Sequence, residues 1–349
     1  MNNRIKTVIA ILGVSLVCLL VTSCDFFQFG NKLPDEDNGQ TNANPVPDDA
    51  YYARKMALNT ELGMPVYKGD VRQTDENHWL ISRPGYTLSF NHERNIPNWV
   101  CWHIEEDDVG HLERPKNKFT NDPLIKKGWE PVMYFDYHYS NYGFDRGHMC
   151  PNGDRNNDRQ NQLDTFYMTN MVPQAGENNQ HAWAYLERAI RDDYVANNME
   201  VYVVSGPSLQ NGGTTVKKTG KYSHPGGTWD HITSTHNNGK KVRIDVPAYT
   251  WKVIIAIPVG EDDVARINAN PGIAEVYAVW MDNSDVVCKG KSYDDFLVSI
   301  DFVEEMTGLD FFPFLEDAVE AQLESLNSEF DPVLVPTFIY EEPELDEAA

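Results

Sequence analysis

Two segments of this chain decide its fold, GFDRGHMCP at residues 143–151 and YMTNMVPQAGENNQHAWAYLERAIR at residues 167–191. The first segment alternates apolar and polar residues and ends at a proline, which predicts a short strand with His148 at its end. Residues 165–171 read TFYMTNM and are rich in β-branched and aromatic side chains, so they predict a second strand that Pro173 stops. The order so far is strand, loop, strand.

A helix is predicted to follow, from about residue 178 to about residue 198. Four apolar side chains recur there at helical spacing with charged residues between them, namely Trp183, Leu186, Ile190 and Tyr194. The local unit is therefore strand, loop, strand and helix.

The polar residues of this unit are of types that do chemistry together. A histidine such as His148 is the usual general base near neutral pH. Asn179 lies at the predicted helix start, where its amide oxygen can bind a hard cation such as Mg²⁺, which keeps most of its waters. Glu187 lies two turns further on and can hold one of those waters, and Arg191 neighbours it on the helix surface. With Arg146 beside the histidine, the set suits the attack of water on a phosphodiester.

Each residue taken singly also has an ordinary structural explanation. An isolated histidine at a strand end is more often a surface or hydrogen-bonding residue. An asparagine at a helix start, here Asn178 or Asn179, is more often an N-cap. Glu187 and Arg191 can form a solvated ion pair that contributes little to stability. Only their combination, in this order, favours a site.

That combination resembles the DNA/RNA non-specific endonucleases, the ββα-metal family of Serratia nuclease and endonuclease G. The family signature is D-R-G-H, then T/S-N-x-x-P-Q, then N-Q-x-x-W-x-x-L-E. The matching residues here are Asp145 to His148, then Thr169, Asn170, Pro173 and Gln174, then Asn179, Gln180, Trp183, Leu186 and Glu187. Weaker matches extend the resemblance over about residues 85–312.

The resemblance implies a role for each matched residue. His148 is implied as the general base and Asn179 as the single direct protein ligand of Mg²⁺, with Mn²⁺ as the second candidate ion. Glu187 is implied to anchor metal-bound water, and Asn170 to support the site. Two arginines are implied to contact phosphate, namely Arg146 and Arg191.

Three further arginines are weaker candidates. The family carries a phosphate-stabilising arginine near residues 114–118, but this sequence does not match that position cleanly. We choose Arg114, with Lys118 as the alternative and a solvated loop charge as the ordinary explanation. Residues 152–162 read NGDRNNDRQNQ and predict a polar surface loop near the cleft mouth, where Arg155 and Arg159 are candidates for substrate contact. A loop that is merely solvated explains them equally well.

Composition limits how the chain can bind nucleic acid. The 349 residues include 29 Lys and Arg against 53 Asp and Glu, a formal net charge of −24. This charge argues against a protein that coats nucleic acid with a broad basic surface. It does not exclude an enzyme that must release its product, and it predicts weak binding without metal and strong salt dependence.

Five cysteines are present, and three of them fall in the predicted folded part: Cys101, Cys150 and Cys288. They allow at most one internal disulfide with one thiol left over, and their spacing matches no zinc pattern. Cys150 lies two residues after His148, where a small buried residue is favoured over a catalytic thiol.

The N-terminus predicts export. Residues 1–23 have a basic start and an apolar run too short for a comfortable transmembrane helix. The run ends in VTSC, which resembles the lipobox of bacterial lipoproteins and implies lipid attachment at Cys24. An ordinary signal peptide is the alternative. Residues 24–50 are rich in Asn, Asp, Pro and Gly and predict a disordered tether.

The remaining chain predicts one endonuclease domain at residues 51–320 and an acidic C-terminal tail at residues 321–349. The expected fold class is α+β, with a central antiparallel sheet flanked by helices and the ββα-metal unit on one face. Residues 211–238 are glycine-rich and contain three histidines. We interpret them as a variable loop rather than a zinc site.

The sequence therefore predicts a Mg²⁺-dependent endonuclease that hydrolyses DNA and RNA with little sequence preference, and the family implies 5′-phosphate products. The expected location is a bacterial membrane, on its periplasmic or cell-surface side. The rival hypothesis is a catalytically silent nucleic-acid-binding or surface lipoprotein on the same fold. A weaker one is a phosphodiesterase or phosphatase acting on small nucleotides.

Overall fold

A computed structural model describes residues 49–332, apart from residues 70–74, 117, 211–212 and 218–225. These residues belong to one compact unit, Pro47–Ala349. The predicted signal peptide, Cys24, nearly all of the tether and the last residues of the acidic tail lie outside the described part of the chain. Within that part, no helix is both long enough and apolar enough to span a bilayer.

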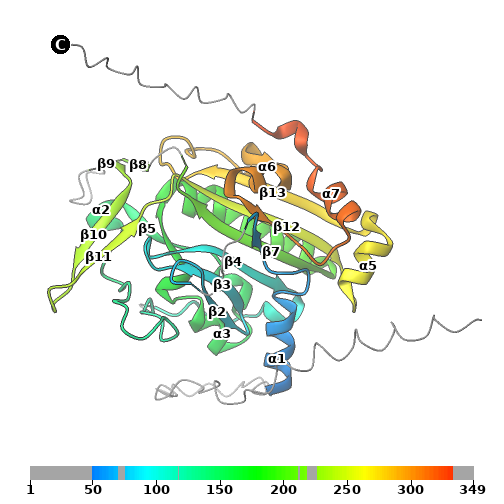
Figure 1. Cartoon of the computed structure of the whole chain (residues 1–349), viewed down its shortest axis with the longest axis horizontal. Helices are drawn as coiled ribbons and strands as arrows, with labels where there is room; N and C mark the ends of the chain where they lie inside the picture. The colour runs from blue at the N-terminus through cyan, green and yellow to red at the C-terminus, as the bar shows by residue number, and fades with distance from the viewer. Residues whose placement is uncertain (1–48, 70–74, 117, 211–212, 218–225, 333–349) are drawn as a thin grey trace, which may run out of the picture. The chain divides into compact units, whose positions relative to one another are not determined.

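The centre of the fold is a seven-stranded sheet in which all neighbouring strands are antiparallel. In spatial order the strands are β14 (Leu297–Val298), β13 (Glu275–Asp282), β12 (Tyr249–Pro258), β7 (Met199–Ser208), β4 (Ile96–Ile104), β3 (Tyr86–Asn91) and β2 (Trp79–Arg83). The predicted fold class, a central antiparallel sheet with helices, is confirmed (Figure 1).

Both faces of this sheet are covered, so residues of its central strands are buried on both sides. Trp251 and Lys252 are neighbours in β12 and point to opposite faces of the sheet. Both are completely buried. On the first face of the sheet, Ile254 packs with Trp102 and Trp183. On the second face, Val253 belongs to a separate apolar cluster.

Three helices cover the second face, namely α5 (Asp263–Ala269), α6 (Ile300–Thr307) and α7 (Asp317–Glu324). Figure 1 shows α6 lying over β13 with α7 beside it. Helix α6 ends at Gly308, which takes the left-handed conformation with φ of 72°. The N-terminal helix, α1 (Asp49–Leu58), covers part of β4.

A separate two-stranded ribbon pairs β5 (Phe144–His148) with β6 (Met171–Ala175). The prediction for β5 is confirmed, but the predicted strand at residues 165–171 is wrong. Residues 168–170 form a 3₁₀ turn, and the strand begins at Met171 and includes Pro173. Pro173 is tolerated because β6 pairs on one side only, so the missing N–H interrupts no second ladder.

The predicted helix after the ribbon is confirmed, although it is not a regular α-helix. It consists of two π-helical segments, η4 (Asn178–Trp183) and η5 (Ile190–Tyr194), around α4 (Ala184–Ala189), and ends in a 3₁₀ turn. Its apolar stripe, which includes Trp183, Leu186 and Ile190, packs on the first face of the sheet.

The predicted surface loop at residues 152–162 is corrected by the structure. It folds into a 3₁₀ turn, η2 (Asn152–Arg155), and the helix α3 (Arg159–Asp164). Asp158 begins α3 by accepting a hydrogen bond from the Asn161 N–H at 2.7 Å. The polar composition of residues 152–162 did not predict that they are folded and partly buried. Their buried side chains bond to backbone oxygens of segments distant in the sequence.

Small paired elements lie around the sheet. They are the hairpin β10 (His231–Thr235) with β11 (Lys241–Asp245), the pair β8 (Thr214–Val216) with β9 (Gly227–Trp229), and β1 (Val66–Tyr67) with β15 (Leu309–Asp310). The glycine-rich segment predicted to be a variable loop therefore contains strands. Cys101, Cys150 and Cys288 are buried and free, so these three form no disulfide.

The predicted boundary between domain and tail at residue 320 falls inside α7. Leu323 is buried in the core, and Asp331 accepts hydrogen bonds from both the N–H and the hydroxyl of Ser299 at 2.6 Å. The folded part therefore continues to Asp331.

Candidate active site

The ribbon and the helix hold His148 between them. His148 ends β5 opposite Met171 of β6. Its backbone oxygen accepts a hydrogen bond from Trp183 Nε1 at 3.2 Å. Because Trp183 lies four residues after Asn179 and four before Glu187, this bond fixes His148 beside the helix segment that carries both.

The environment of the His148 ring keeps it neutral. The ring lies between Phe119 and Phe166, with centroid distances of 5.6 and 5.0 Å. Burial lowers the pKa of His148 well below its ordinary value, and the charges of Arg114 and Arg146 lower it further. Its Nε2 has no hydrogen-bond partner in the described residues. A neutral imidazole with a free nitrogen can accept a proton.

The amide of Asn179 is oriented by Asp145 of β5. Asn179 Nδ2 donates to Asp145 Oδ2 at 2.9 Å, and Gln180 Nε2 donates to the same oxygen at 2.7 Å. The nitrogen of the Asn179 amide is therefore used, whereas its oxygen, Oδ1, accepts no hydrogen bond in the described part of the chain. A hard cation takes such an oxygen, so the donor chemistry fits the predicted metal.

Asn178, unlike Asn179, has a structural role. It is fully buried, and its Nδ2 donates to Asp282 O at 2.8 Å and to Thr250 Oγ1 at 3.1 Å. Its oxygen accepts from Gln174 Nε2. Asn178 therefore ties the helix to β12 and β13. Neither asparagine is an N-cap, because the two residues before them, Gly176 and Glu177, are already helical.

Glu187 lies in a half-buried position among charged groups. Burial raises the pKa of Glu187 to about 7, and the charge of Asp154 contributes in the same direction. Lys252, Arg191 and Arg114 oppose this rise. Glu187 is thus poised to change its protonation state near neutral pH.

Lys252 is a site neighbour that the sequence pattern did not single out. Its ammonium nitrogen lies 4.1 Å from the centroid of the Trp183 ring and 5.6 Å from that of Trp102. It has no hydrogen-bond partner among the described residues, and burial lowers its pKa while Glu187 opposes that change. The one available signal was a lysine inside an otherwise apolar strand.

The three arginines proposed to contact phosphate are held differently. Arg146 Nη1 donates to Tyr134 O at 2.6 Å, and its guanidinium stacks 4.1 Å from the Phe119 centroid. Arg191 Nη1 pairs with the buried Asp154 at 2.6 Å. Arg114 lies over the Phe166 ring at 5.1 Å and makes no hydrogen bond in the described chain. Arg114 is therefore the arginine with the most unused donors.

The sequence predicted Arg155 in a surface loop, but its side chain is buried. It is 2% exposed, and its guanidinium donates to Gly85 O at 2.6 Å and to His103 O at 2.5 Å, and pairs with Asp108 at 3.2 Å. It is a structural residue, and we withdraw it from the substrate-binding set. Arg159 remains exposed, although its Nη1 donates to Gln162 Oε1 at 2.6 Å.

Asn170 supports the strand end from beneath. Its side chain accepts from Cys150 N and donates to Cys150 O and Thr165 O, each at 2.9 Å. Cys150 is a buried core residue, and burial raises the pKa of its thiol. Gly147 is required by packing, because a Cβ there would lie 1.9 Å from Gln174 Oε1.

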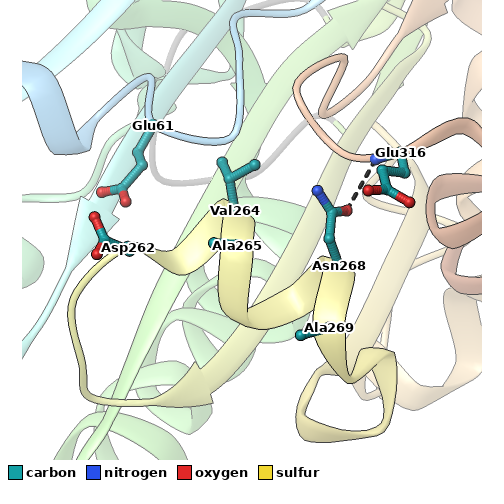
Figure 2. A pocket seen from close by; sticks show the side chains of 7 residues that line it. All are labelled: Glu61, Asp262, Val264, Ala265, Asn268, Ala269 and Glu316. Carbon is teal, nitrogen blue, oxygen red and sulfur yellow. Dashed lines mark hydrogen bonds between the residues drawn. The ribbon is translucent and has the colours of Figure 1, made fainter. Parts of the chain in front are cut away.

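One surface depression lies apart from this site. It lies along α5 and is lined by residues that include Glu61, Asp262, Asn268 and Glu316 (Figure 2). None of the candidate site residues lines it. Among its lining residues, Glu316 N donates a hydrogen bond to Asn268 Oδ1 at 2.9 Å (Figure 2).

Comparison with known proteins gives consistent matches. The profile of the family described as DNA/RNA non-specific endonuclease matches residues 66–318. A nuclease of Nostoc sp. is 27% identical over 314 residues, covering 90% of this chain and 96% of that protein. Nuclease C1 of Cunninghamella echinulata var. echinulata is 29% identical over 241 residues, covering 68% and 84%.

A solved structure, that of the EndoG/EndoGI complex, shares the fold. The TM-score is 0.53 and the sequence identity 23%, with 75% of this chain and 93% of that chain covered.

Proposed function

We propose, from the premise that this chain belongs to the DNA/RNA non-specific endonuclease family, that it is a metal-dependent endonuclease acting at the His148 site. The substrates we propose are DNA and RNA, cleaved with little sequence preference to leave 5′-phosphate ends. The observation that carries the proposal is the buried, neutral His148 with a free Nε2, held beside the helix of Asn179 and Glu187.

His148 acts as the general base in this proposal. Its imidazole takes a proton from the water that attacks phosphorus. Burial, Arg114 and Arg146 all disfavour the protonated ring, so the base form persists below the ordinary histidine pKa. Phe119 and Phe166 fix the ring plane, and Asn170 fixes the backbone that follows it.

A divalent cation would be held by Asn179 Oδ1, with Glu187 placed to hold its coordinated water. When bound, the ion supplies positive charge that offsets the charge developing on phosphate and leaving oxygen. We propose Mg²⁺, with Mn²⁺ as the second candidate. Asp145 orients the Asn179 amide so that its oxygen, and not its nitrogen, is presented.

The arginines hold the phosphate. Arg114 offers unused donors, while Arg146 and Arg191 are already anchored by Tyr134 O and Asp154. Anchored cations stabilise transition-state charge with little reorganisation. Recognition of phosphate and not of bases is what allows one site to cleave both polymers.

The test uses the full-length chain with supercoiled plasmid and with RNA, in Mg²⁺ or in EDTA. We expect cleavage in Mg²⁺ and none in EDTA. His148→Ala should lose about 10²–10⁴-fold in rate, the usual contribution of a general base, while remaining folded. Asn179→Ala should lose cleavage and metal dependence together.

Two matched controls separate chemistry from packing. His111→Ala changes an exposed histidine outside the site. Gln180→Ala removes the other donor to the same Asp145 oxygen without removing the proposed metal ligand. Both should stay near wild-type activity. A folded wild-type chain that cleaves neither polymer under any divalent metal, or that binds them equally in EDTA, would favour a silent binding protein.

We also propose that the protein is exported and held on a bacterial membrane through lipidated Cys24, on the periplasmic or cell-surface side. The support is the VTSC motif after an apolar run and the Asn-, Asp- and Pro-rich spacer at residues 24–50. Separation of cell membranes from soluble extract measures this placement.

A further inference from the structure

The second face of the sheet carries a cluster of carboxylates between α6 and α7. One oxygen from each of Asp301, Glu304 and Glu324 lies within 4.8 Å of the other two. Glu304 and Glu324 are 3% and 7% exposed, whereas Asp301 faces solvent. Figure 1 shows the two helices that carry these residues next to each other. Their apolar sides pack with Trp251 and Val253 of β12, on the face away from Trp183.

The protein's own donors do not neutralise this cluster. Glu304 Oε2 pairs with Lys68 Nζ at 2.7 Å, and Glu304 Oε1 accepts from Phe311 N at 2.7 Å. Lys68 is half-exposed. Glu324 Oε1 is buried and has no hydrogen-bond partner in the described chain, and Glu320 Oε1 is in the same condition. Burying a carboxylate without a partner costs free energy of folding. A positive group bound here would offset that cost.

The protonation behaviour of the cluster agrees with this geometry. Burial, followed by the charges of Glu304 and Glu320, raises the pKa of Glu324 to about 9. Burial and the neighbouring carboxylates Asp310 and Glu304 raise the pKa of Glu320 to about 7. At neutral pH these groups therefore retain protons that a bound cation would displace.

We propose that Asp301, Glu304 and Glu324 bind one divalent cation of the calcium type, which ties α7 to α6 and is separate from the active-site metal. The donors are all carboxylate oxygens, the ligands of hard cations. Two oxygens on one calcium ion lie at most about 5 Å apart, since each is about 2.3–2.6 Å from the ion. The observed spacing satisfies that limit. Magnesium fits less well, because it demands a tight octahedron and gives up water reluctantly.

The experiment measures thermal unfolding of the full-length Asn179→Ala protein, freed of metal with EDTA and dialysed, against added CaCl₂. The Asn179→Ala background removes the proposed active-site ligand, so any response arises elsewhere. We expect millimolar Ca²⁺ to raise Tm by about 3 °C or more. Equilibrium dialysis with radioactive calcium should find one ion per chain.

Adding Glu324→Gln should abolish both the Tm rise and the bound ion. Glu305→Gln changes an exposed residue of α6, the helix that carries Asp301 and Glu304, and should abolish neither. If Glu324→Gln does not fold, the exposed Asp301→Asn takes its place and should weaken Ca²⁺ binding at least tenfold. A Ca²⁺ response that is absent in Asn179→Ala, or unchanged in the cluster variants, would overturn the proposal and leave a proton shared between Glu304 and Glu324 as the explanation.

The proposed calcium site and the proposed nuclease activity can be tested independently of each other. In the chain with Asn179 intact, Glu324→Gln should cleave plasmid in Mg²⁺ at the wild-type rate, because no cluster residue contacts the His148 site. A variant that loses Ca²⁺ binding but retains nuclease activity is affected only at the carboxylate cluster of the second face. His148→Ala should show the opposite, losing activity while retaining Ca²⁺ binding, because it is affected only at the active site.

Discussion

At the scale of single residues, the site depends on charges held out of water. Lys252 lies beneath Trp183 with no hydrogen-bond partner in the described residues, and its charge opposes the rise in the Glu187 pKa. It does so from inside the sheet, where it cannot contact substrate. We therefore regard Lys252 as a positioning residue that keeps Glu187 ionised. Isolated buried cations of this kind are rare without such a role.

Replacing Lys252 by methionine should leave the fold intact and change the pH dependence of cleavage. The Glu187 pKa, now about 7, should rise by roughly one unit once the charge that lowers it most is gone. The acid limb of the activity profile should move to higher pH by a similar amount, with the largest loss of rate at or below pH 7. Plasmid cleavage measured from pH 5.5 to pH 9 tests this.

Lys289→Met, on the protein surface, serves as the control for a simple loss of charge. It should leave the profile unchanged. If the Lys252→Met profile coincides with wild type, Glu187 does not depend on this ammonium and the assignment fails.

At the scale of elements, the β10–β11 hairpin is fastened to the segment at residues 130–136. His236 Nδ1 contacts Glu130 at 2.7 Å and Nε2 contacts Asp136 at 2.9 Å, with Phe135 edge-on to the ring. Asn238 and Lys240 of the same turn also contact Glu130. The fastened segment includes Tyr134, whose carbonyl holds Arg146, so this clamp reaches the candidate active site.

The clamp should make stability depend on pH. Burial lowers the His236 pKa, but the bonds to Glu130 and Asp136 outweigh it and raise the net value above 6.5. His236 bonding lowers the Glu130 pKa to about 2. The raised histidine contributes stability that is complete below its unfolded pKa and is lost as pH rises through the folded value. The lowered carboxyl contributes stability above about pH 4.5 that is lost on acidification.

His236→Gln should therefore be destabilised most between about pH 4.5 and pH 6.5. The difference in Tm from wild type should shrink as pH rises above that window. Thermal unfolding from pH 4.5 to pH 9 measures it, with the exposed His111→Gln as control. A constant difference across this range would show that the charge of His236 is not involved.

At the scale of the whole molecule, the net charge of −24 opposes approach of nucleic acid. The candidate site offsets this locally with Arg114, Arg146 and Arg191, two of which are anchored by protein acceptors. Binding should consequently rest on a few phosphate contacts and on the metal. The proposed lipid attachment at Cys24 would fix where such an enzyme meets its substrate.

Cys24→Ser should release the protein from the membrane. The thioether to the lipid needs the cysteine sulfur, and one or two acyl chains provide most of the membrane affinity of a soluble domain. Labelled palmitate should enter the wild-type chain and not the variant, and the variant should move to the soluble fraction or culture medium with its nuclease activity intact. A wild-type chain that incorporates no label would leave the ordinary signal peptide as the explanation.

The sequence by itself determined the family, the antiparallel sheet and the order of the local unit. The helix stripe of Trp183, Leu186 and Ile190 repeats at helical spacing, so the helix was readable.

Only the tertiary structure decided which polar residues serve the site and which serve the fold. Arg155 and Arg159 look alike in a polar run, yet the first is buried in backbone bonds and the second is exposed. Asn178 and Asn179 are adjacent and identical, yet one ties the sheet and the other presents its oxygen. Lys252, the His236 clamp and the Asp301–Glu304–Glu324 cluster join residues far apart in the chain. Such long-range contacts set burial and charge, and no local pattern in the sequence records them.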